Sequence, residues 1–164
     1  MNIILIGMPG CGKSTVGVVL AKALGMDFID SDLVIQKQTG KRLSQIIEEC
    51  GDDGFREVEN RINAGLEAVS SVIATGGSVV YGEDAMRHLK DIGTVIYLKL
   101  SCPTIADRLG DLHARGVTIK PGWTLQDLYN ERTPLYEKWA DITVDCEHMM
   151  LREVVEYITK QIGA

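Results

Sequence analysis

Short apolar runs alternate along the chain with longer stretches in which apolar residues recur every three or four positions. Five of the runs are rich in β-branched residues and predict strands at residues 2–6, 27–29, 71–75, 94–100 and 141–144. Most of these runs are continuously apolar rather than alternating, which is typical of strands covered on both faces of a sheet. The pattern therefore predicts a parallel sheet between two layers of helices.

The stretches between the predicted strands carry helical signals. Residues 13–24 precede Gly25, a residue type that commonly ends helices, and residues 124–139 begin with a spacing like that of a capping box. A final helix is predicted over residues 148–162. Residues 53–69 have one apolar stripe, made of Phe55, Val58, Ile62, Leu66 and Val69. We therefore expect a three-layer α/β/α fold with a five-stranded parallel sheet, in which ligands bind at the carboxyl ends of the strands.

Composition limits the classes of partner. The chain has 164 residues and a net charge of −6, which suits one domain over residues 1–164 and argues against nucleic acid or an anionic membrane as a partner. The four cysteines form no C-x-x-C pair, so reduced thiols are expected. The amino-terminal run lacks the basic region and cleavage site of a signal peptide, and no run is long enough to span a membrane. We expect a cytoplasmic protein and a monomer.

The segment GMPGCGKST, residues 7–15, directly follows the first predicted strand and opens the first predicted helix. It matches G-x-x-x-x-G-K-[ST] in full, the pattern of a loop whose backbone N–H groups surround phosphate oxygens. Lys13 is expected to reach the β- and γ-phosphates of ATP, and the Ser14 hydroxyl is expected to bind Mg²⁺. The residues expected to bind the nucleotide here are Gly10, Cys11, Gly12, Lys13, Ser14 and Thr15.

Two aspartates, Asp30 and Asp32, follow the second predicted strand. In an extended segment, residues two apart face the same way. One carboxylate can then support the water shell of a metal ion while the other accepts a proton from an attacking hydroxyl. The alternative is that Ser31 or Asp32 only caps the following helix.

Two arginines are candidates for binding an anionic substrate. Arg56 and Glu59 are three residues apart, and periodicity alone favours a solvent-exposed pair on a helix surface. Arg132 lies on an apolar stripe, where its guanidinium needs a carboxylate from the protein or from a ligand. Pro134 is expected to kink the helix at this point.

Two glycine-containing segments complete the candidate chemistry. ATGGS, residues 74–78, has paired glycines that permit a ligand to approach the backbone, although a plain tight turn would read the same. HARGVTIKPG, residues 113–122, is basic and has no clear helical or strand period. We interpret residues 110–122 as a lid that covers phosphate.

Taken in order, these motifs resemble those of the shikimate kinase family, which belongs to the nucleoside-monophosphate-kinase-like group of P-loop proteins. The family's phosphate loop, D-x-D pair, F-R-x-x-E segment, G-G-G turn and R-x-P-L-Y helix are similar to residues 7–15, 30–32, 55–59, 76–78 and 132–136. The resemblance covers nearly the whole chain. It implies ATP-dependent phosphorylation of a shikimate hydroxyl, with an acceptor-binding region at about residues 31–62.

The resemblance also implies individual roles on the acceptor side. Asp32 would contact the substrate hydroxyls and act as, or near, the catalytic base, and Asp30 would support Mg²⁺ through water. Arg56 and Arg132 would hold the substrate carboxylate, with the glycine backbone at Gly76 and Gly77 beside it.

On the nucleotide side, the resemblance implies that Arg115 of the lid adds positive charge at the transferring phosphate, as a catalytic residue together with Lys13. Arg108 would lie against the adenine.

Two departures from the family pattern bear on the substrate. Ser78 stands where the family has a third glycine, and the lid reads Arg115-Gly116-Val117-Thr118 where the family reads arginine-proline-leucine-leucine. Two other functions therefore stay open. One is a kinase of the same fold that acts on another small hydroxy acid, such as gluconate, and the other is a non-catalytic nucleotide-binding regulator.

Overall fold

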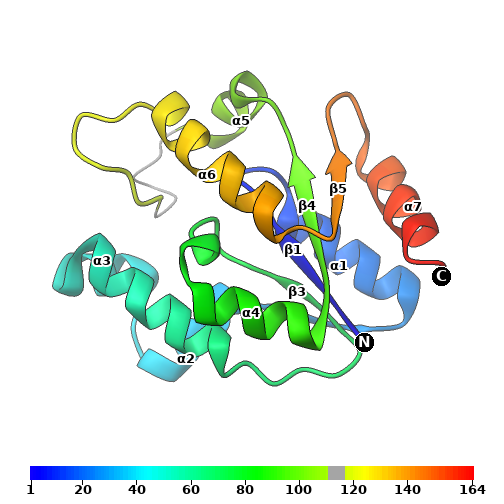
Figure 1. Cartoon of the computed structure of the whole chain (residues 1–164), viewed down its shortest axis with the longest axis horizontal. Helices are drawn as coiled ribbons and strands as arrows, with labels where there is room; N and C mark the ends of the chain where they lie inside the picture. Colours follow the sequence, from blue (N-terminus) through cyan, green and yellow to red (C-terminus); the bar gives the residue numbers. More distant parts are fainter. Residues whose placement is uncertain (111–116) are drawn as a thin grey trace.

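The computed structural model describes residues 1–110 and 117–164 of the chain. Within these residues, parallel strands form a five-stranded sheet in the order β2-β3-β1-β4-β5 (Figure 1). The strands are β1 (Asn2–Ile6), β2 (Asp27–Asp30), β3 (Ser71–Ala74), β4 (Gly93–Lys99) and β5 (Ile142–Asp145). The predicted parallel sheet is confirmed, and each strand lies within one or two residues of its expected position.

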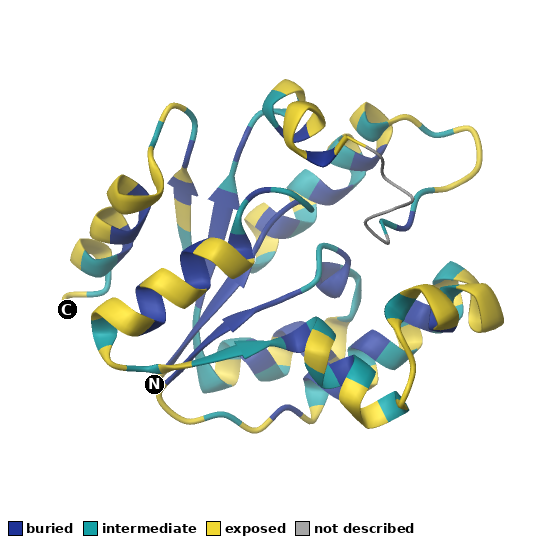
Figure 2. Cartoon of the chain, turned by 180° about the vertical axis from the view of Figure 1, so that it is seen from behind, coloured by how far each residue is buried: buried dark blue, intermediate teal, exposed yellow. Residues whose placement is uncertain are grey.

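Helices cover both faces of the sheet. α4 and α6 lie in front of it in Figure 1, whereas α1 lies in front of it in Figure 2, which shows the molecule from behind. The predicted three-layer α/β/α arrangement is therefore confirmed. The helices are α1 (Lys13–Leu24), α2 (Ser31–Thr39), α3 (Leu43–Ala64), α4 (Glu83–Ile92), α5 (Cys102–Leu109), α6 (Leu125–Trp139) and α7 (Leu151–Gln161), with a short 3-10 helix η1 (Val79–Tyr81).

The central strands form the core. Every residue of β1 is buried, and residues 95–98 of β4 are buried as well (Figure 2). Because successive side chains of a strand point to opposite faces, continuous burial means that helices cover both faces. This is the physical reason why the apolar runs of the sequence do not alternate.

The strand register brings the loops of the candidate site together. Leu5 of β1 pairs with Ala74 of β3, and Ala74 pairs with Asp30 of β2. The chain segments that follow these residues therefore leave the sheet at the same edge. They carry the phosphate loop, the second aspartate and the paired glycines.

The predicted helix at residues 53–69 differs from the observed α3. α3 begins at Leu43, contains a non-helical residue at Gly51 with φ 71°, and ends at Ala64. Leu66 is buried outside the helix, while Val69 is 82% exposed. The predicted end was too late because the apolar spacing continues past the last helical residue. The predicted start was too late because Gly51, with its positive φ, joins two helical segments that the periodicity did not connect.

Two local predictions concern α6. Thr124 and Asp127 form the expected capping box, with the Asp127 N–H donating to Thr124 Oγ1 at 3.2 Å. Pro134 lies inside α6, which continues as one helix from Leu125 to Trp139, and the expected kink at this residue stays a prediction. The last helix, α7, is shorter at both ends than the predicted residues 148–162.

None of the helices in residues 1–110 and 117–164 combines the length and hydrophobicity that crossing a membrane requires.

Gly93 provides a test of the sheet packing. A Cβ at this position would lie 2.3 Å from the carbonyl oxygen of Asn2 in β1, so Gly93→Ala must push β4 away from β1. We expect a loss of about 1–3 kcal/mol in the free energy of unfolding, as for other overpacked sites. At about 2–4 °C per kcal/mol for a chain of this size, thermal denaturation detects such a change.

Gly65→Ala is the matched control for this substitution. A Cβ at Gly65 would approach no atom more closely than 3.7 Å, so its melting temperature should stay close to that of the wild type. Equal melting temperatures for Gly93→Ala and Gly65→Ala would contradict the close approach of β4 to β1.

Candidate active site

The phosphate loop connects β1 to α1 in a backbone conformation that requires glycine. Gly7, Gly10 and Gly12 all have positive φ values, of 151°, 80° and 98°. Lys13 is buried, and its Nζ donates hydrogen bonds across the loop to the carbonyl oxygens of Gly7 at 2.7 Å and Met8 at 2.9 Å. The lysine charge is therefore held inside the curve of the loop, as phosphate binding requires.

Cys11 fills the inside of this loop. Its side chain is buried, and its Sγ lies 2.8 Å from the point that a Cβ on Gly7 would occupy. Lys13 Nζ is 3.7 Å from the same sulfur. The position therefore admits only a small side chain, because Gly7 and Lys13 both pack against it.

A second cavity, of about 170 Å³, adjoins the loop. Arg108 of α5 lies at its wall and donates from Nη1 to the carbonyl oxygen of Gly10 at 3.4 Å. This contact holds Arg108 next to the phosphate loop, and its expected place against the adenine stays a prediction. The cavity is lined by Cys11, Gly12, Thr15, Val16, Arg108, Cys146, Met149, Leu151 and Val154.

The two aspartates lie at the same edge of the sheet but in different secondary structure. Asp30 is the last residue of β2 and caps α2, since its Oδ1 accepts the N–H of Asp32 at 3.0 Å. The capping alternative is therefore realised by Asp30 rather than by Ser31 or Asp32. Asp32 belongs to the first turn of α2, so the expectation of two carboxylates in one extended segment is wrong. The helical turn instead directs Asp32 into the cavity described below.

Ser14 and Asp30 fit a magnesium ion that is bound mainly by water and phosphate. The Ser14 hydroxyl lies 3.5 Å from Asp30 Oδ2, next to the phosphate loop. No cluster of three or more acidic, histidine or cysteine side chains suited to a metal occurs among the described residues. Mg²⁺ commonly binds through few protein ligands together with substrate phosphates, and the pair matches that donor set.

A cavity of about 290 Å³ opens between the phosphate loop, α2, α3, α6 and the turn after β3. It places Lys13, Asp32 and Arg132 around one space, together with the backbone of Gly76 and Gly77. The described lining residues are Pro9, Gly10, Gly12, Lys13, Ser14, Thr15, Asp32, Leu43, Phe55, Glu59, Thr75, Gly76, Gly77, Ser78, Val117, Thr118 and Arg132.

Asp32 has an unusual proton affinity. The pKa of this carboxyl is raised to about 6, chiefly by burial and in smaller part by the neighbouring charge of Asp30, while the charge of Lys13 opposes the shift. A carboxyl with this pKa is mostly ionised at neutral pH, yet it is more basic than an ordinary aspartate. It is therefore suited to accept a proton from a hydroxyl.

Glu59 is buried, so its interpretation as part of a solvent-exposed pair is wrong. Only 2% of the residue is exposed, and its Oε1 accepts a hydrogen bond from Ser78 Oγ at 2.5 Å. The pKa of Glu59 is raised to about 7, chiefly by burial, although the hydrogen bond from Ser78 opposes this shift. The negative charge of Asp32 contributes to the rise, and the positive charges of Arg132 and Arg56 oppose it.

Arg132 is 1% exposed, and no carboxylate of the described residues lies within 4 Å of it. Its Nη2 donates to the carbonyl oxygen and the Oγ1 of Thr118, at 3.3 and 3.2 Å, and its Nε donates to the Tyr81 hydroxyl at 3.4 Å. Its Nη1 lies 3.0 Å from the point that a Cβ on Gly77 would occupy. Arg132 therefore has no carboxylate partner among the described residues, and a carboxylate on a ligand is the alternative that fits.

Tyr81 links the two arginines, and sequence reasoning missed it. The guanidinium of Arg56 stacks 3.8 Å from the centre of the Tyr81 ring, and that of Arg132 lies 5.5 Å from it. The Nε of Arg56 is buried and has no hydrogen-bond partner among the described residues. Arg56 does not line the 290 Å³ cavity itself, so it stands behind the site rather than at its wall.

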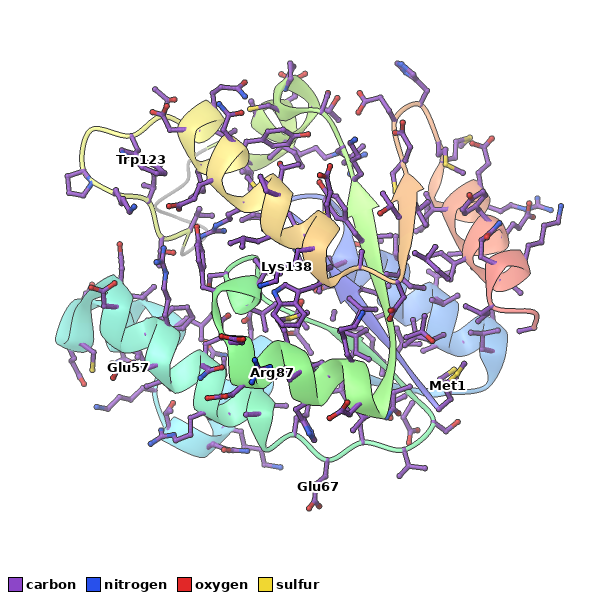
Figure 3. All side chains as sticks on the ribbon, viewed as in Figure 1. Met1, Glu57, Glu67, Arg87, Trp123 and Lys138 are labelled. Carbon is purple, nitrogen blue, oxygen red and sulfur yellow. The ribbon has the colours of Figure 1, made fainter. Side chains whose placement is uncertain are left out.

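The Tyr81 hydroxyl also connects to the segment that precedes α6. It donates to Glu131 Oε2 at 2.6 Å, and Lys120 Nζ lies 3.3 Å from the other oxygen of Glu131. Lys120 also stacks on Trp123, which is labelled on the loop in Figure 3. No local sequence pattern predicts these contacts, because they join elements that are far apart in the sequence, η1, α3 and α6. Arg115 lies outside the described residues.

A phosphate loop at the carboxyl edge of a parallel sheet, open to a cavity with a buried arginine and a basic carboxylate, defines a P-loop kinase of small molecules. A family model described as "Shikimate kinase" matches residues 9–163. The chain therefore belongs to the shikimate kinase family.

Individual relatives agree with this assignment. The chain is 40% identical over 163 residues to a shikimate kinase of Thermodesulfovibrio yellowstonii, covering 98% of this chain and 94% of that protein. A solved structure of shikimate kinase from Acinetobacter baumannii in complex with shikimate matches with a TM-score of 0.87 and 32% identity, covering 98% and 92% of the two chains. The crystal structure of shikimate kinase from Aquifex aeolicus matches with a TM-score of 0.83 and 34% identity, covering 99% and 96%.

The buried carboxyl of Glu59 predicts how stability depends on pH. Its folded pKa of about 7 lies above the ordinary value of about 4.5, so folding favours the protonated form. The stability from this group is fully present below the ordinary pKa and is lost as the pH rises through about 7. The free energy of unfolding of the wild type should therefore fall by up to about 3 kcal/mol between pH 5 and pH 8 because of this group. Glu59→Gln should abolish that part of the fall, which thermal denaturation across the same pH range measures.

Glu57→Gln is the control, because Glu57 lies exposed on the same helix (Figure 3). Its melting temperature should follow the wild-type pH profile. Parallel profiles for wild type and Glu59→Gln would show that Glu59 does not titrate as a buried group.

Proposed function

We propose that this protein transfers the γ-phosphoryl group of ATP to a hydroxyl of shikimate, giving shikimate 3-phosphate and ADP. The strongest support is the guanidinium of Arg132, buried at the wall of the cavity without a carboxylate among the described residues. A buried, uncompensated charge is costly, so a carboxylate on the acceptor would provide the missing partner. The Acinetobacter baumannii relative, solved with shikimate, supports shikimate as that acceptor.

The donor side of the reaction follows from the phosphate loop. Backbone N–H groups of the loop hold the β- and γ-phosphates, and Lys13 adds its charge from inside the curve. Ser14 and Asp30 would hold Mg²⁺, Asp30 through water. When bound, this ion neutralises negative charge on the phosphate oxygens. The adenosine part of ATP occupies the cavity beside Arg108.

The acceptor side positions the attacking hydroxyl. Arg132 binds the acceptor carboxylate in a directional way, because the planar guanidinium matches a carboxylate with two parallel hydrogen bonds. Arg56 adds positive charge from behind Tyr81, and the Gly76–Gly77 backbone lies against the acceptor. Asp32 then accepts the proton of the attacking hydroxyl.

The remaining assignments rest on the sequence. Residues 31–62 serve as the acceptor-binding region and residues 110–122 as the lid of one kinase domain. The monomeric state and the cytoplasmic location stay predictions.

The direct test of the proposed function is ADP release with ATP, Mg²⁺ and a panel of shikimate, quinate and gluconate. We expect saturable ADP release with shikimate, phosphorylation of its 3-hydroxyl by ³¹P NMR, and a much higher KM for Arg132→Lys, which keeps the charge but loses the planar fork. Turnover on gluconate alone would favour the hydroxy-acid alternative, which is suggested by Ser78 and by the altered lid sequence Arg115-Gly116-Val117-Thr118. Binding of ATP without turnover on any of the acids would favour the non-catalytic regulator.

Arg115→Ala tests the lid. If Arg115 contributes charge only in the transition state, kcat should fall by about 10³–10⁵, by analogy with arginine fingers, while the Kd for ATP changes little. Stopped-flow turnover and calorimetric ATP titration measure the two quantities separately. Arg152→Ala, at an exposed arginine of α7, should leave both unchanged. Normal turnover in Arg115→Ala would remove Arg115 from the mechanism.

A further inference from the structure

Tyr136 of α6 is a buried residue beside the site, and its hydroxyl has no part in the reaction proposed above. α6 lies in front of the sheet in Figure 1, and the Tyr136 ring stacks on Tyr97 of β4 with the ring centres 5.1 Å apart. Both residues are at most 1% exposed. Burial raises the pKa of Tyr136, so its hydroxyl keeps its proton and can donate it to a hydrogen bond. The stack therefore places one fixed hydrogen-bond donor at the edge of the site.

This hydroxyl contacts the turn after β3. It donates to the carbonyl oxygen of Gly77 at 2.6 Å, across 59 residues of sequence, and the Sδ of Met8 in the phosphate loop lies 3.8 Å from it. Gly77 lines the 290 Å³ cavity, whereas Tyr136 is not among the described lining residues. The bond therefore holds the Gly77 carbonyl on the side of the turn that faces away from the cavity.

The Gly77 carbonyl belongs to the central peptide of a β-turn over residues 76–79. The N–H of Val79 donates to the carbonyl oxygen of Gly76 at 3.2 Å, and Ser78 has φ −94° and ψ 0°, which fit the third residue of a type I turn. The peptide is trans, so the N–H of Ser78 points opposite to the carbonyl of Gly77. No backbone carbonyl of the described residues accepts a hydrogen bond from this N–H. It therefore faces the cavity, where it can donate to a ligand.

The competing conformation is a type II turn, in which the central peptide is reversed. That turn needs a positive φ at its third residue, which glycine adopts readily and serine does not. A reversed peptide would present the Gly77 carbonyl to the cavity in place of the N–H of residue 78. An anionic acceptor would then meet a partial negative charge. Two features oppose the reversal, the serine at position 78 and the hydrogen bond from Tyr136.

We propose that Tyr136 is a positioning residue, whose hydroxyl holds the Gly77–Ser78 peptide with its N–H toward the acceptor. The inference rests on the proposed function for its acceptor. Tyr136 acts through the turn, so its loss affects acceptor binding. ATP binding stays nearly unchanged, because the contact of Tyr136 with the phosphate loop is a 3.8 Å approach to the Met8 sulfur.

Steady-state kinetics of Tyr136→Phe test this role, because phenylalanine keeps the stacked ring and removes the hydroxyl. The test is sharpest in a Ser78→Gly background, where no serine opposes the reversal of the peptide. There we expect the KM for shikimate to rise about tenfold relative to Ser78→Gly alone, with kcat and the KM for ATP nearly unchanged. With Ser78 in place the rise should be smaller. A fall in kcat without a change in the KM for shikimate would overturn the proposal.

Tyr97→Phe in the same background is the matched control, because it removes the other hydroxyl of the stack. That hydroxyl is buried and has no hydrogen-bond partner among the described residues, so the KM for shikimate should stay within about twofold. Thermal denaturation verifies that both variants are folded at the assay temperature. Equal changes in KM from the two substitutions would mean that the stack matters and the bond to Gly77 does not, which would overturn the positioning role.

A spectrum without substrate decides the orientation of the peptide even if shikimate proves not to be the acceptor. The ψ angle of Gly77 would be about −30° in a type I turn and about +120° in a type II turn, and the amide ¹⁵N resonance of residue 78 responds to this angle. In the Ser78→Gly background, movement of this resonance with Tyr136→Phe and not with Tyr97→Phe supports the proposal. An unmoved resonance, or equal movement in both variants, overturns it. Failure of the wild type to phosphorylate shikimate would instead contradict the proposed function.

Discussion

The buried guanidinium of Arg132 is the constraint around which the acceptor site is arranged. The residue is 1% exposed, and its partners among the described residues are neutral oxygens of Thr118 and Tyr81 rather than a carboxylate. Hydrogen bonds of this kind satisfy individual donors but do not neutralise the charge. The site therefore retains an affinity for an anion of the right shape, which is how a ligand gains both binding energy and orientation from one side chain.

Two buried carboxyls, those of Asp32 and Glu59, lie in the same site as this positive charge. Asp32 and Glu59 both have raised pKa values, because burial disfavours their charged forms more than the nearby cations favour them. Such groups reduce the stability of the folded protein at neutral pH, and proteins commonly accept this loss where chemistry requires it. The hydroxyl of Ser78 donates a hydrogen bond to the buried carboxyl of Glu59 within this site.

The sheet carries these charges at the edge where they meet. β1 and β4 are buried on both faces, so their loops emerge from a rigid base, and the register of β1, β3 and β2 aligns the phosphate loop with the turn at Gly76 and with Asp30. Close packing explains why small displacements matter here. At Gly77, a Cβ would lie within 3.0 Å of both Pro9 and Arg132, so the turn, the loop and α6 approach one another without room for a side chain.

The sequence alone determined the features that depend on neighbouring residues. Continuous apolar runs predicted the parallel sheet, and residues 7–15 identified the phosphate loop, because a strand, a glycine turn and a helix start lie together in the chain. Only the tertiary structure decided the burial of Glu59, its bond to Ser78 and the stacking of both arginines on Tyr81. These contacts join residues 19 or more positions apart, and helical periodicity cannot show which face of α3 another segment covers.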